Sequence, residues 1–307
     1  MTALAVHGGC GIWLPRIESA ASEGCRHAVA EGRDILLQGG SAIEAVTAAC
    51  VALEDNPVFN AGTGSVLNYD GNAQMDASFM EGDTLRFGAV GAIERVKNPI
   101  LVAQKVVEKT DHNILVGSGA VEFARKIGFA DYDPRTEARI AEYQALRAKV
   151  PDGELKVSQF ISGHPEHAHS LTIGTVGAVA LDSYGHLAAA TTTGGMPLKL
   201  PGRLGDTPLP GGGTYATAHS AASSTGPGES VMRILGAREV CDLIDGGCIA
   251  QLAVEQTLQR IQKLFAMETG LIALDEYGRV GIAHRTPEMP HAFFVGDRAI
   301  IARIRAE

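Results

Sequence analysis

The chain has 307 residues, of which 45% are hydrophobic and 20% are charged, and its formal net charge is −9. This balance allows a large buried core and excludes a wholly disordered protein. The basic residues are scattered, which argues against nucleic acid as a partner, because phosphate backbones are bound by clustered Lys and Arg. No apolar run reaches the ~20 residues of a membrane span, so no membrane partner is expected either.

The composition is unusual in its 37 glycines and in its odd number of cysteines, which are Cys10, Cys25, Cys50, Cys241 and Cys248. None of the cysteines has the close spacing of a metal site, and residues 1–12 lack the cationic start of a signal peptide. We therefore expect free thiols in a reducing, cytoplasmic compartment. The glycines predict many tight turns and close approaches of the backbone.

The first part of the chain is predicted to alternate strands with helices. Short apolar runs predict strands over residues 3–7, 73–80, 86–93 and 113–116. Helical periodicity predicts helices over residues 17–37, from 99 to about 109, and from 117 to about 127. A further helix is expected to begin after Ser41, which can form a capping box with Glu44.

Residues 131–170 differ from their surroundings, because they are polar, contain three prolines and lack a strand pattern. We expect a helix over 137–149 and a mobile linker elsewhere in this segment. After it, the pattern predicts hairpins over 176–192, 271–283 and 291–304. Two more helices are predicted over 229–244 and 249–265.

The order of these elements predicts the fold class. Antiparallel strand pairs separated by long helices indicate an α+β protein with two sheets covered by helices on their outer faces, not a doubly wound parallel sheet. Residues 1–170 and 171–307 share the strands too evenly to be independent. We therefore expect a single domain over residues 1–307.

Common catalytic and ligand-binding signatures are missing from the sequence. It contains no G-x-G-x-x-G, no P-loop, no G-x-S-x-G, no C-x-x-C and no H-E-x-x-H motif. Three histidines, His164, His167 and His169, lie close together in the expected linker. A metal site demands fixed geometry, so we interpret these histidines as part of a solvated loop.

A candidate nucleophile lies at Gly174-Thr175, directly after the expected linker and before a buried strand. A threonine hydroxyl becomes a good nucleophile when its own α-amine, with a pKa near ~8, is free to act as a base. The amine is free only if the Gly174–Thr175 bond is cut, and glycine leaves that bond open to attack. The alternative is that Thr175 is an ordinary β-branched strand residue, and spacing alone does not decide.

Seven motifs in order along the chain bear on this choice. They are V-H-G-G at 6–9, N-P-V-F-N-A-G-T-G at 56–64, M-D-A-S at 75–78, G-T-V-G-A-V-A-L-D at 174–182, T-G-G at 193–195, P-G-R-L-G-D at 201–206 and S-T-G-P-G-E at 224–229. Together they resemble the plant-type L-asparaginase / isoaspartyl aminopeptidase family of N-terminal nucleophile hydrolases. The resemblance implies a four-layer αββα sandwich, self-cleavage before the threonine and assembly as an (αβ)2 homo-oligomer.

By this resemblance, Thr175 is the nucleophile of both self-cleavage and hydrolysis. Thr193 is implied to lie beside it and to adjust its proton, whereas we interpret Thr191 and Thr192 as β-branched strand residues. Asn60 is implied to contact the active site.

Substrate-binding residues are implied in the same way. Arg203 suits a carboxylate, through two parallel hydrogen bonds, and Asp206 suits the ammonium group of an amino-acid substrate. The alternative for this pair is a surface salt bridge worth ~0–1 kcal/mol. Thr225 and Gly226 are implied to form the oxyanion hole and to contact substrate, near a helix start with unpaired N–H groups. Pro227 removes one N–H donor there and leaves the fine substrate preference open.

The resemblance also implies a structural sodium ion in the 53–63 loop. Its ligands would be the backbone carbonyl oxygens of Leu53, Glu54, Asn56, Phe59, Ala61 and Thr63. Because only backbone atoms are involved, the side chains do not test this expectation. The alternative is a glycine-rich turn without a metal.

The sequence therefore predicts a threonine hydrolase that cuts itself into an α subunit, 1–174, and a β subunit, 175–307. The mature enzyme would hydrolyse the side-chain amide of L-asparagine, β-aspartyl dipeptides or both, releasing L-aspartate without an organic cofactor. Ile173, where histidine is commoner, leaves the rate of self-cleavage open.

Three alternatives stay open. Two belong to the same class, a glycosylasparaginase and a protein-cutting threonine endopeptidase, although relatives of these kinds typically have Asp-Thr where this chain has Gly174-Thr175. The third, from a different class, is an unprocessed, non-catalytic binding relative.

Overall fold

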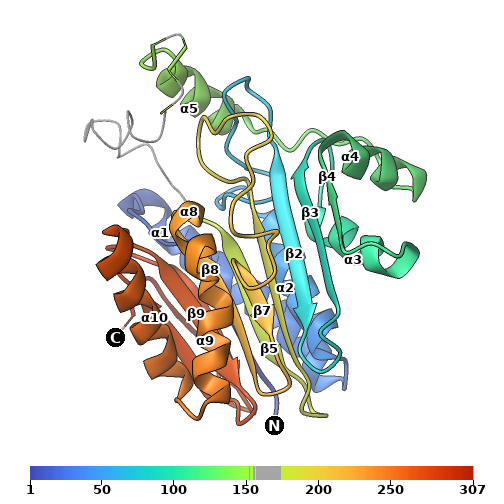
Figure 1. Cartoon of the computed structure of the whole chain (residues 1–307), viewed down its shortest axis with the longest axis vertical. Helices are drawn as coiled ribbons and strands as arrows, with labels where there is room; N and C mark the ends of the chain where they lie inside the picture. Colours follow the sequence, from blue (N-terminus) through green and yellow to red (C-terminus); the bar gives the residue numbers. More distant parts are fainter. Residues whose placement is uncertain (152, 155, 157–173, 307) are drawn as a thin grey trace.

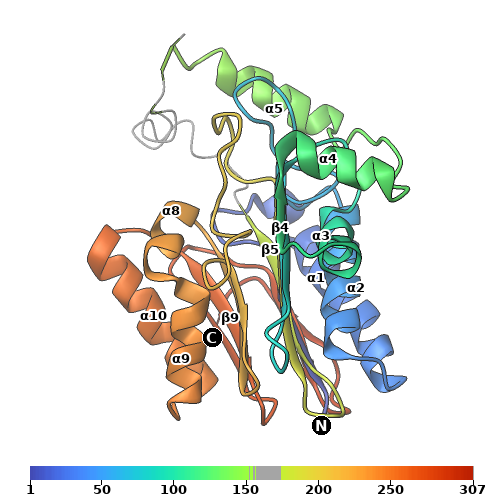
Figure 2. The same ribbon diagram turned by 45° about the vertical axis from the view of Figure 1, so that its right-hand side comes forward.

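The computed structural model describes residues 1–151, 153–154, 156 and 174–306, and it stacks two β-sheets between two layers of helices (Figure 1). Figure 2 shows the layers from the side. Helices α9 (Gly236–Asp245) and α10 (Ala250–Phe265) cover the smaller sheet. The larger sheet is covered by α1 (Pro15–Leu37), α2 (Ala42–Asp55) and α3 (Pro99–Lys109). The predicted four-layer α+β sandwich is confirmed.

The larger sheet has the strand order β12-β11-β1-β5-β6-β2-β3-β4. Its strands are β1 (Ala3–His7), β2 (Met75–Glu81), β3 (Phe87–Ile93), β4 (Ile114–Val116), β5 (Val176–Leu181), β6 (Leu187–Thr193), β11 (His291–Val295) and β12 (Ile301–Arg303). Neighbouring strands are antiparallel except β3 and β4, which are parallel because α3 crosses over between them. Since β1 pairs with both β5 and β11, the two parts of the chain share one sheet.

The smaller sheet is antiparallel, with the order β10-β9-β8-β7. Its strands are β7 (Thr214–Ala216), β8 (Ser220–Thr225), β9 (Gly270–Asp275) and β10 (Val280–His284). The sequence predicts β9 and β10 as a hairpin but neither β7 nor β8. Those two strands consist mostly of Ser, Thr and Ala, and they lack the alternation of large apolar residues that indicates a strand.

Local sequence explains where several helices begin and break. The capping box of α2 forms as predicted, with Ser41 N donating to Glu44 Oε2 at 2.8 Å. The single helix predicted over 229–244 is wrong. It consists of α8 (Gly228–Val231), a 3-10 turn η1 (Met232–Ile234) and α9, with a break at Leu235. The φ of Leu235 is 53°, a left-handed conformation that ends a right-handed helix.

The helices α4 (Gly117–Lys126) and α5 (Glu137–Arg147) match the predicted ones. The first part of the predicted linker is anchored to the protein, because Gly64 N donates to Pro134 O at 2.9 Å and Arg139 Nε donates to Gly64 O at 2.6 Å. The three histidines of the expected solvated loop lie outside the described residues.

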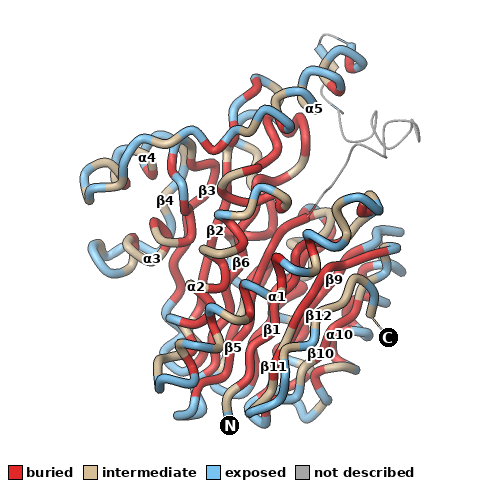
Figure 3. The backbone as a smooth tube through the Cα atoms, turned by 180° about the vertical axis from the view of Figure 1, so that it is seen from behind, coloured by how far each residue is buried: buried red, intermediate tan, exposed pale blue. Residues whose placement is uncertain are grey.

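Both sheets are largely buried, as the tube in Figure 3 shows. The central strands β5 and β6 are buried along their whole length, because helices cover one face and the other sheet covers the second. Polar side chains on the inner faces therefore need hydrogen-bond partners within the protein. Among the described residues, no helix is both long and apolar enough to cross a membrane.

Candidate active site

Thr175 and Thr193 lie side by side where two strands of the larger sheet meet. Strands β5 and β6 pair with Val176 opposite Thr192, so the residue before β5 faces the last residue of β6. The Thr175 hydroxyl donates to the Thr193 hydroxyl at 3.2 Å. Both side chains are buried, with 7% and 2% of their residues' surface exposed. The strand register thus brings the predicted nucleophile to its predicted partner.

Gly174 packs directly on the turn that follows β1. A Cβ atom at Gly9 would lie 2.2 Å from Gly174 Cα, and one at Gly174 would lie 2.7 Å from Gly9 Cα. Atoms cannot approach so closely, so only glycine fits at either position. Gly9 also has a φ of 104°, which favours glycine. While the Gly174–Thr175 bond is intact, the nitrogen of Thr175 is part of a peptide bond and cannot act as a base.

Asn60 shapes the turn that follows Thr193. Its Nδ2 donates to Gly195 O at 2.7 Å, and its Oδ1 accepts from Val66 N at 2.9 Å. Gly195 N in turn donates to Thr193 Oγ1 at 2.9 Å. The described contacts of Asn60 therefore reach the threonine pair through the turn.

Arg203 forms an ion pair that the sequence did not indicate. Its Nε and Nη2 donate to the two carboxylate oxygens of Glu229, each at 2.8 Å. The salt bridge considered from the sequence joined Arg203 to Asp206 instead. Glu229 was missed because it lies 26 residues away in the chain and stood out only as the last residue of a motif.

Asp206 is a buried carboxylate with 3% of its surface exposed. The Ser224 hydroxyl donates to its Oδ2 at 2.7 Å, and a Cβ at Gly228 would lie 2.7 Å from its Oδ1. Burial raises the pKa of Asp206 to about 6, against the lowering effects of Ser224 and of the Arg203 charge. Such a carboxylate is suited to pair with an ammonium group that enters the site.

Thr225 lies at the end of β8, fully buried, and is tied to the turn on which Gly174 packs. Cys10 N donates to Thr225 Oγ1 at 3.3 Å. The next residue, Gly226, has a φ of 128°, and a Cβ there would lie 2.8 Å from Thr269 Cγ2. Because α8 has only four residues, an oxyanion here would depend on individual N–H groups more than on a helix dipole.

The loop predicted to hold sodium is closed by its own hydrogen bonds. Thr63 N donates to Glu54 O at 2.8 Å, and Phe59 N donates to Asn56 O at 3.1 Å. Each carbonyl oxygen keeps a second lone pair, so these contacts leave room for a cation. The described residues contain no cluster of His, Cys, Asp or Glu side chains that could hold a metal instead.

The side chain of Glu54 adds an acidic group to this loop. Its Oε1 accepts from Ile100 N at 3.1 Å and from the Thr192 hydroxyl at 2.7 Å, whereas its buried Oε2 has no hydrogen-bond partner in the described structure. Burial raises the pKa of Glu54 to about 8. The carbonyl oxygens of this loop are hard donors that suit an alkali cation, whereas the Glu54 side chain is mostly protonated and neutral near pH 7.

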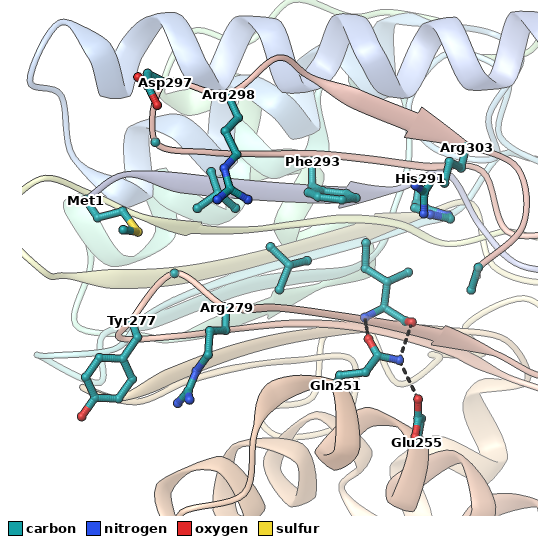
Figure 4. A pocket seen from close by; sticks show the side chains of 16 residues that line it. Met1, Gln251, Glu255, Tyr277, Arg279, His291, Phe293, Asp297, Arg298 and Arg303 are labelled. Carbon is teal, nitrogen blue, oxygen red and sulfur yellow. Dashed lines mark hydrogen bonds between the residues drawn. The ribbon is translucent and has the colours of Figure 1, made fainter.

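A cavity of about 760 Å³ lies elsewhere, between β10 and β11 (Figure 4). Arg298, Phe293 and His291 line one side of it and Arg279 the other, and none of the predicted site residues contributes. At its edge the side-chain amide of Gln251 accepts from the N–H of Ile282 in β10 at 2.9 Å and donates to the carbonyl of the same residue at 3.1 Å. We therefore assign the candidate active site from the contact between Thr175 and Thr193 and not from the size of this cavity.

Comparison with known proteins identifies the family of the chain. A family model described as "Asparaginase" matches residues 1–301. A plant-type L-asparaginase from Pyrococcus abyssi is 47% identical over 303 residues, covering 95% of this chain and 96% of the relative. An isoaspartyl peptidase from Salmonella typhimurium is 39% identical over 303 residues, covering 96% of both chains, and one from Escherichia coli is 39% identical with 96% and 93% covered. The chain therefore belongs to the asparaginase family of hydrolases.

Proposed function

We propose that this chain is a self-cleaving threonine hydrolase that acts on the side-chain amide of L-asparagine and on β-aspartyl peptides. The observation that carries the proposal is the 3.2 Å contact between the hydroxyls of Thr175 and Thr193, directly after the Gly174–Thr175 bond. The relatives named L-asparaginase and isoaspartyl peptidase support the same two substrates.

Activation begins at the uncut bond. Thr175 Oγ attacks the carbonyl carbon of Gly174, the C–N bond breaks, and the nitrogen leaves as an amine that carries the hydroxyl proton. Water then hydrolyses the resulting ester, which leaves a carboxylate on Gly174 and a free hydroxyl on Thr175. The products have 174 and 133 residues, which together make up the 307 of the chain.

The new amine supplies the base that the uncut chain lacks. It removes the proton of Thr175 Oγ, which attacks the side-chain carbonyl of the substrate, and the N–H groups at Thr225 and Gly226 stabilise the oxyanion. Ammonia or an amino acid leaves with a proton. Water hydrolyses the aspartyl ester, releases L-aspartate and restores the hydroxyl. Thr193 holds the nucleophile in place through the contact already described.

Arg203 and Asp206 hold the two charged groups of the substrate. The guanidinium binds the α-carboxylate, and Glu229 fixes its plane by a two-pronged ion pair. Asp206 binds the α-ammonium group. Asparagine and a β-aspartyl peptide present the same two groups, so this pair accepts both.

We further propose that the 53–63 loop binds a sodium ion through the six carbonyls named above. The ion would brace the loop that carries Asn60, and thereby the turn after Thr193. We also propose that the processed protein assembles as (αβ)2. The free cysteines favour a cytoplasmic location.

The test is a Thr175→Ala variant compared with the wild type. Mass spectrometry of the incubated wild type should show two chains and the variant one. The wild type should release ammonia from L-asparagine and leucine from β-Asp-Leu, and the variant should do neither. A wild type that stays uncut and releases nothing would refute the proposal, as would a variant that is cut at the normal rate.

A further inference from the structure

Five polar side chains form a connected chain between the two sheets, and the proposed reaction uses none of them. His7 Nε2 lies 2.9 Å from Ser223 Oγ, which lies 2.7 Å from Thr191 Oγ1. Thr214 Oγ1 lies 2.6 Å from Thr191 Oγ1 and 2.8 Å from Ser78 Oγ. All five residues have 0% of their surface exposed. Burial lowers the pKa of His7 to about 3, so the network is uncharged.

One side of this network holds the backbone around Asp206. The Thr191 hydroxyl donates to Gly213 O at 3.1 Å, and Gly213 N donates to Asp206 O at 2.8 Å. The Ser78 hydroxyl donates to Thr207 O at 2.6 Å. The segment that carries Asp206 is therefore fixed by hydroxyls from β6 and β2, two strands of the larger sheet.

The other side of the network contacts the strand of the nucleophile. A Cβ at Gly177, two residues after Thr175, would lie 2.0 Å from Ser223 Oγ and 2.7 Å from His7 Nε2. The glycine in β5 thus makes room for the network. Thr191 itself lies on β6, two residues before Thr193. The network therefore contacts the nucleophile strand through Ser223 and His7, and its hydroxyls of Thr191 and Ser78 hold the segment of Asp206.

Stability alone does not require hydroxyls at these positions. A buried site can be filled by apolar groups of the same shape at little cost, whereas a hydroxyl left without a partner costs about 1–3 kcal/mol. What hydrogen bonds add is a defined geometry between the groups that they join. Here the hydrogen bonds join the two sheets next to the strand of Thr175 and the segment of Asp206.

We propose that Thr191, with Ser78 and Ser223, positions Asp206 relative to Thr175 and so sets the preference for ligands that carry an α-ammonium group. This inference rests on the proposed function, in which Asp206 binds that ammonium. Thr191 is then a positioning residue and not the plain strand residue that the sequence indicated.

The test uses Thr191→Val, which keeps the shape of the side chain and removes the hydroxyl. L-Aspartate and succinate differ only in the α-ammonium group, and both are measured as competitive inhibitors of asparagine hydrolysis by the processed protein. The variant should bind L-aspartate about tenfold more weakly, the equivalent of about one hydrogen bond, and succinate within about twofold of the wild type. Thr191→Ser, which restores the hydroxyl, should recover the preference for L-aspartate.

Thr192→Val is the matched control, because Thr192 is the next residue, is equally buried and bonds to Glu54 on the opposite face of β6. It should leave the ratio of the two inhibition constants unchanged. Equal weakening of both inhibitors by Thr191→Val, or no weakening of either, would overturn the inference.

A second pair of variants keeps the inference testable if Thr191→Val fails to fold. Ser223→Ala should change the ratio of inhibition constants in the same direction. Ser220→Ala should not, because Ser220 lies on the same strand but bonds to Asp245. An unchanged ratio in Ser223→Ala would also overturn the inference. A wild type that hydrolyses asparagine separates these failures from failure of the proposed function, which would show as no turnover at all.

Discussion

Lowering the pH from 7 to 5 should remove the preference for ligands that carry an α-ammonium group. Burial raises the pKa of Asp206 from 3.8 to about 6, so the carboxylate is protonated as the pH falls through 6. A neutral carboxyl group cannot form an ion pair with an ammonium group. The α-amine of L-asparagine stays charged over this range, so the change lies in the protein.

The expected size follows from a single titration. A group with a pKa of about 6 is about 90% ionised at pH 7 and about 10% ionised at pH 5, a tenfold difference. The Thr175 amine, with a pKa of about 8, also becomes protonated as the pH falls. Its protonation lowers kcat/KM for every substrate by the same factor. Dividing kcat/KM for L-asparagine by that for succinamate, which lacks only the α-amine, cancels this shared effect.

The assay is ammonia release from both substrates at pH values between 5 and 7. The ratio should fall about tenfold across this range. In Ser224→Ala the fall should begin at higher pH, because the hydrogen bond from Ser224 holds the pKa of Asp206 down. A ratio that is constant with pH would refute the assignment of Asp206.

The raised pKa of Asp206 also makes the free energy of unfolding depend on pH. Between pH 3.8 and 6 the folded protein binds a proton on Asp206 that the unfolded chain does not. The free energy of unfolding therefore falls as the pH rises through this range, by about 3 kcal/mol for this group. Asp206→Asn should lose this dependence in melting experiments, and a variant that keeps it would contradict the argument.

Three further outcomes are expected. Gly9→Ala should block self-cleavage, because its Cβ would overlap Gly174, and two chains in its mass spectrum would contradict this. Arg203→Lys should raise KM for L-asparagine at least about tenfold, since an ammonium group cannot form two parallel hydrogen bonds to a carboxylate, and an unchanged KM would argue against the role of Arg203. Sodium chloride should raise the melting temperature above that in choline chloride of equal ionic strength, and equal values would exclude a stabilising ion in the 53–63 loop.

Local signals in the sequence were enough to predict most of the fold. Apolar runs and the capping box at Ser41 placed the strands of the larger sheet and its covering helices. The break at Leu235 was not predictable, because leucine rarely adopts the left-handed conformation that it has here. Strands β7 and β8 were missed because their small polar residues face another sheet, and a contact between sheets leaves no pattern along the chain.

The residues of the candidate site were predictable as motifs, but their partners were not. Arg203 and Asp206 stood out as a cation and an anion three residues apart, for which a salt bridge between them was the alternative to substrate binding. In the structure Arg203 pairs with Glu229 and Asp206 with Ser224. Thr191 was interpreted as a strand residue, and the positioning role proposed for it depends on contacts with residues far along the chain. The hydrogen-bond partners of these side chains are determined by tertiary packing and not by local sequence.

The amide of Gln251 limits uncontrolled strand pairing between one edge of the smaller sheet and other molecules. Strand β10 is the outermost strand of the smaller sheet, and unsatisfied N–H and C=O groups on such a strand recruit strands from other molecules. By bonding both groups of Ile282, Gln251 imitates a neighbouring strand at one point and blocks continuous pairing there. Shortening the Gln251 side chain would leave the N–H and C=O groups of Ile282 free to pair with another molecule. The expected effect is aggregation in concentrated solution and not a lower catalytic rate.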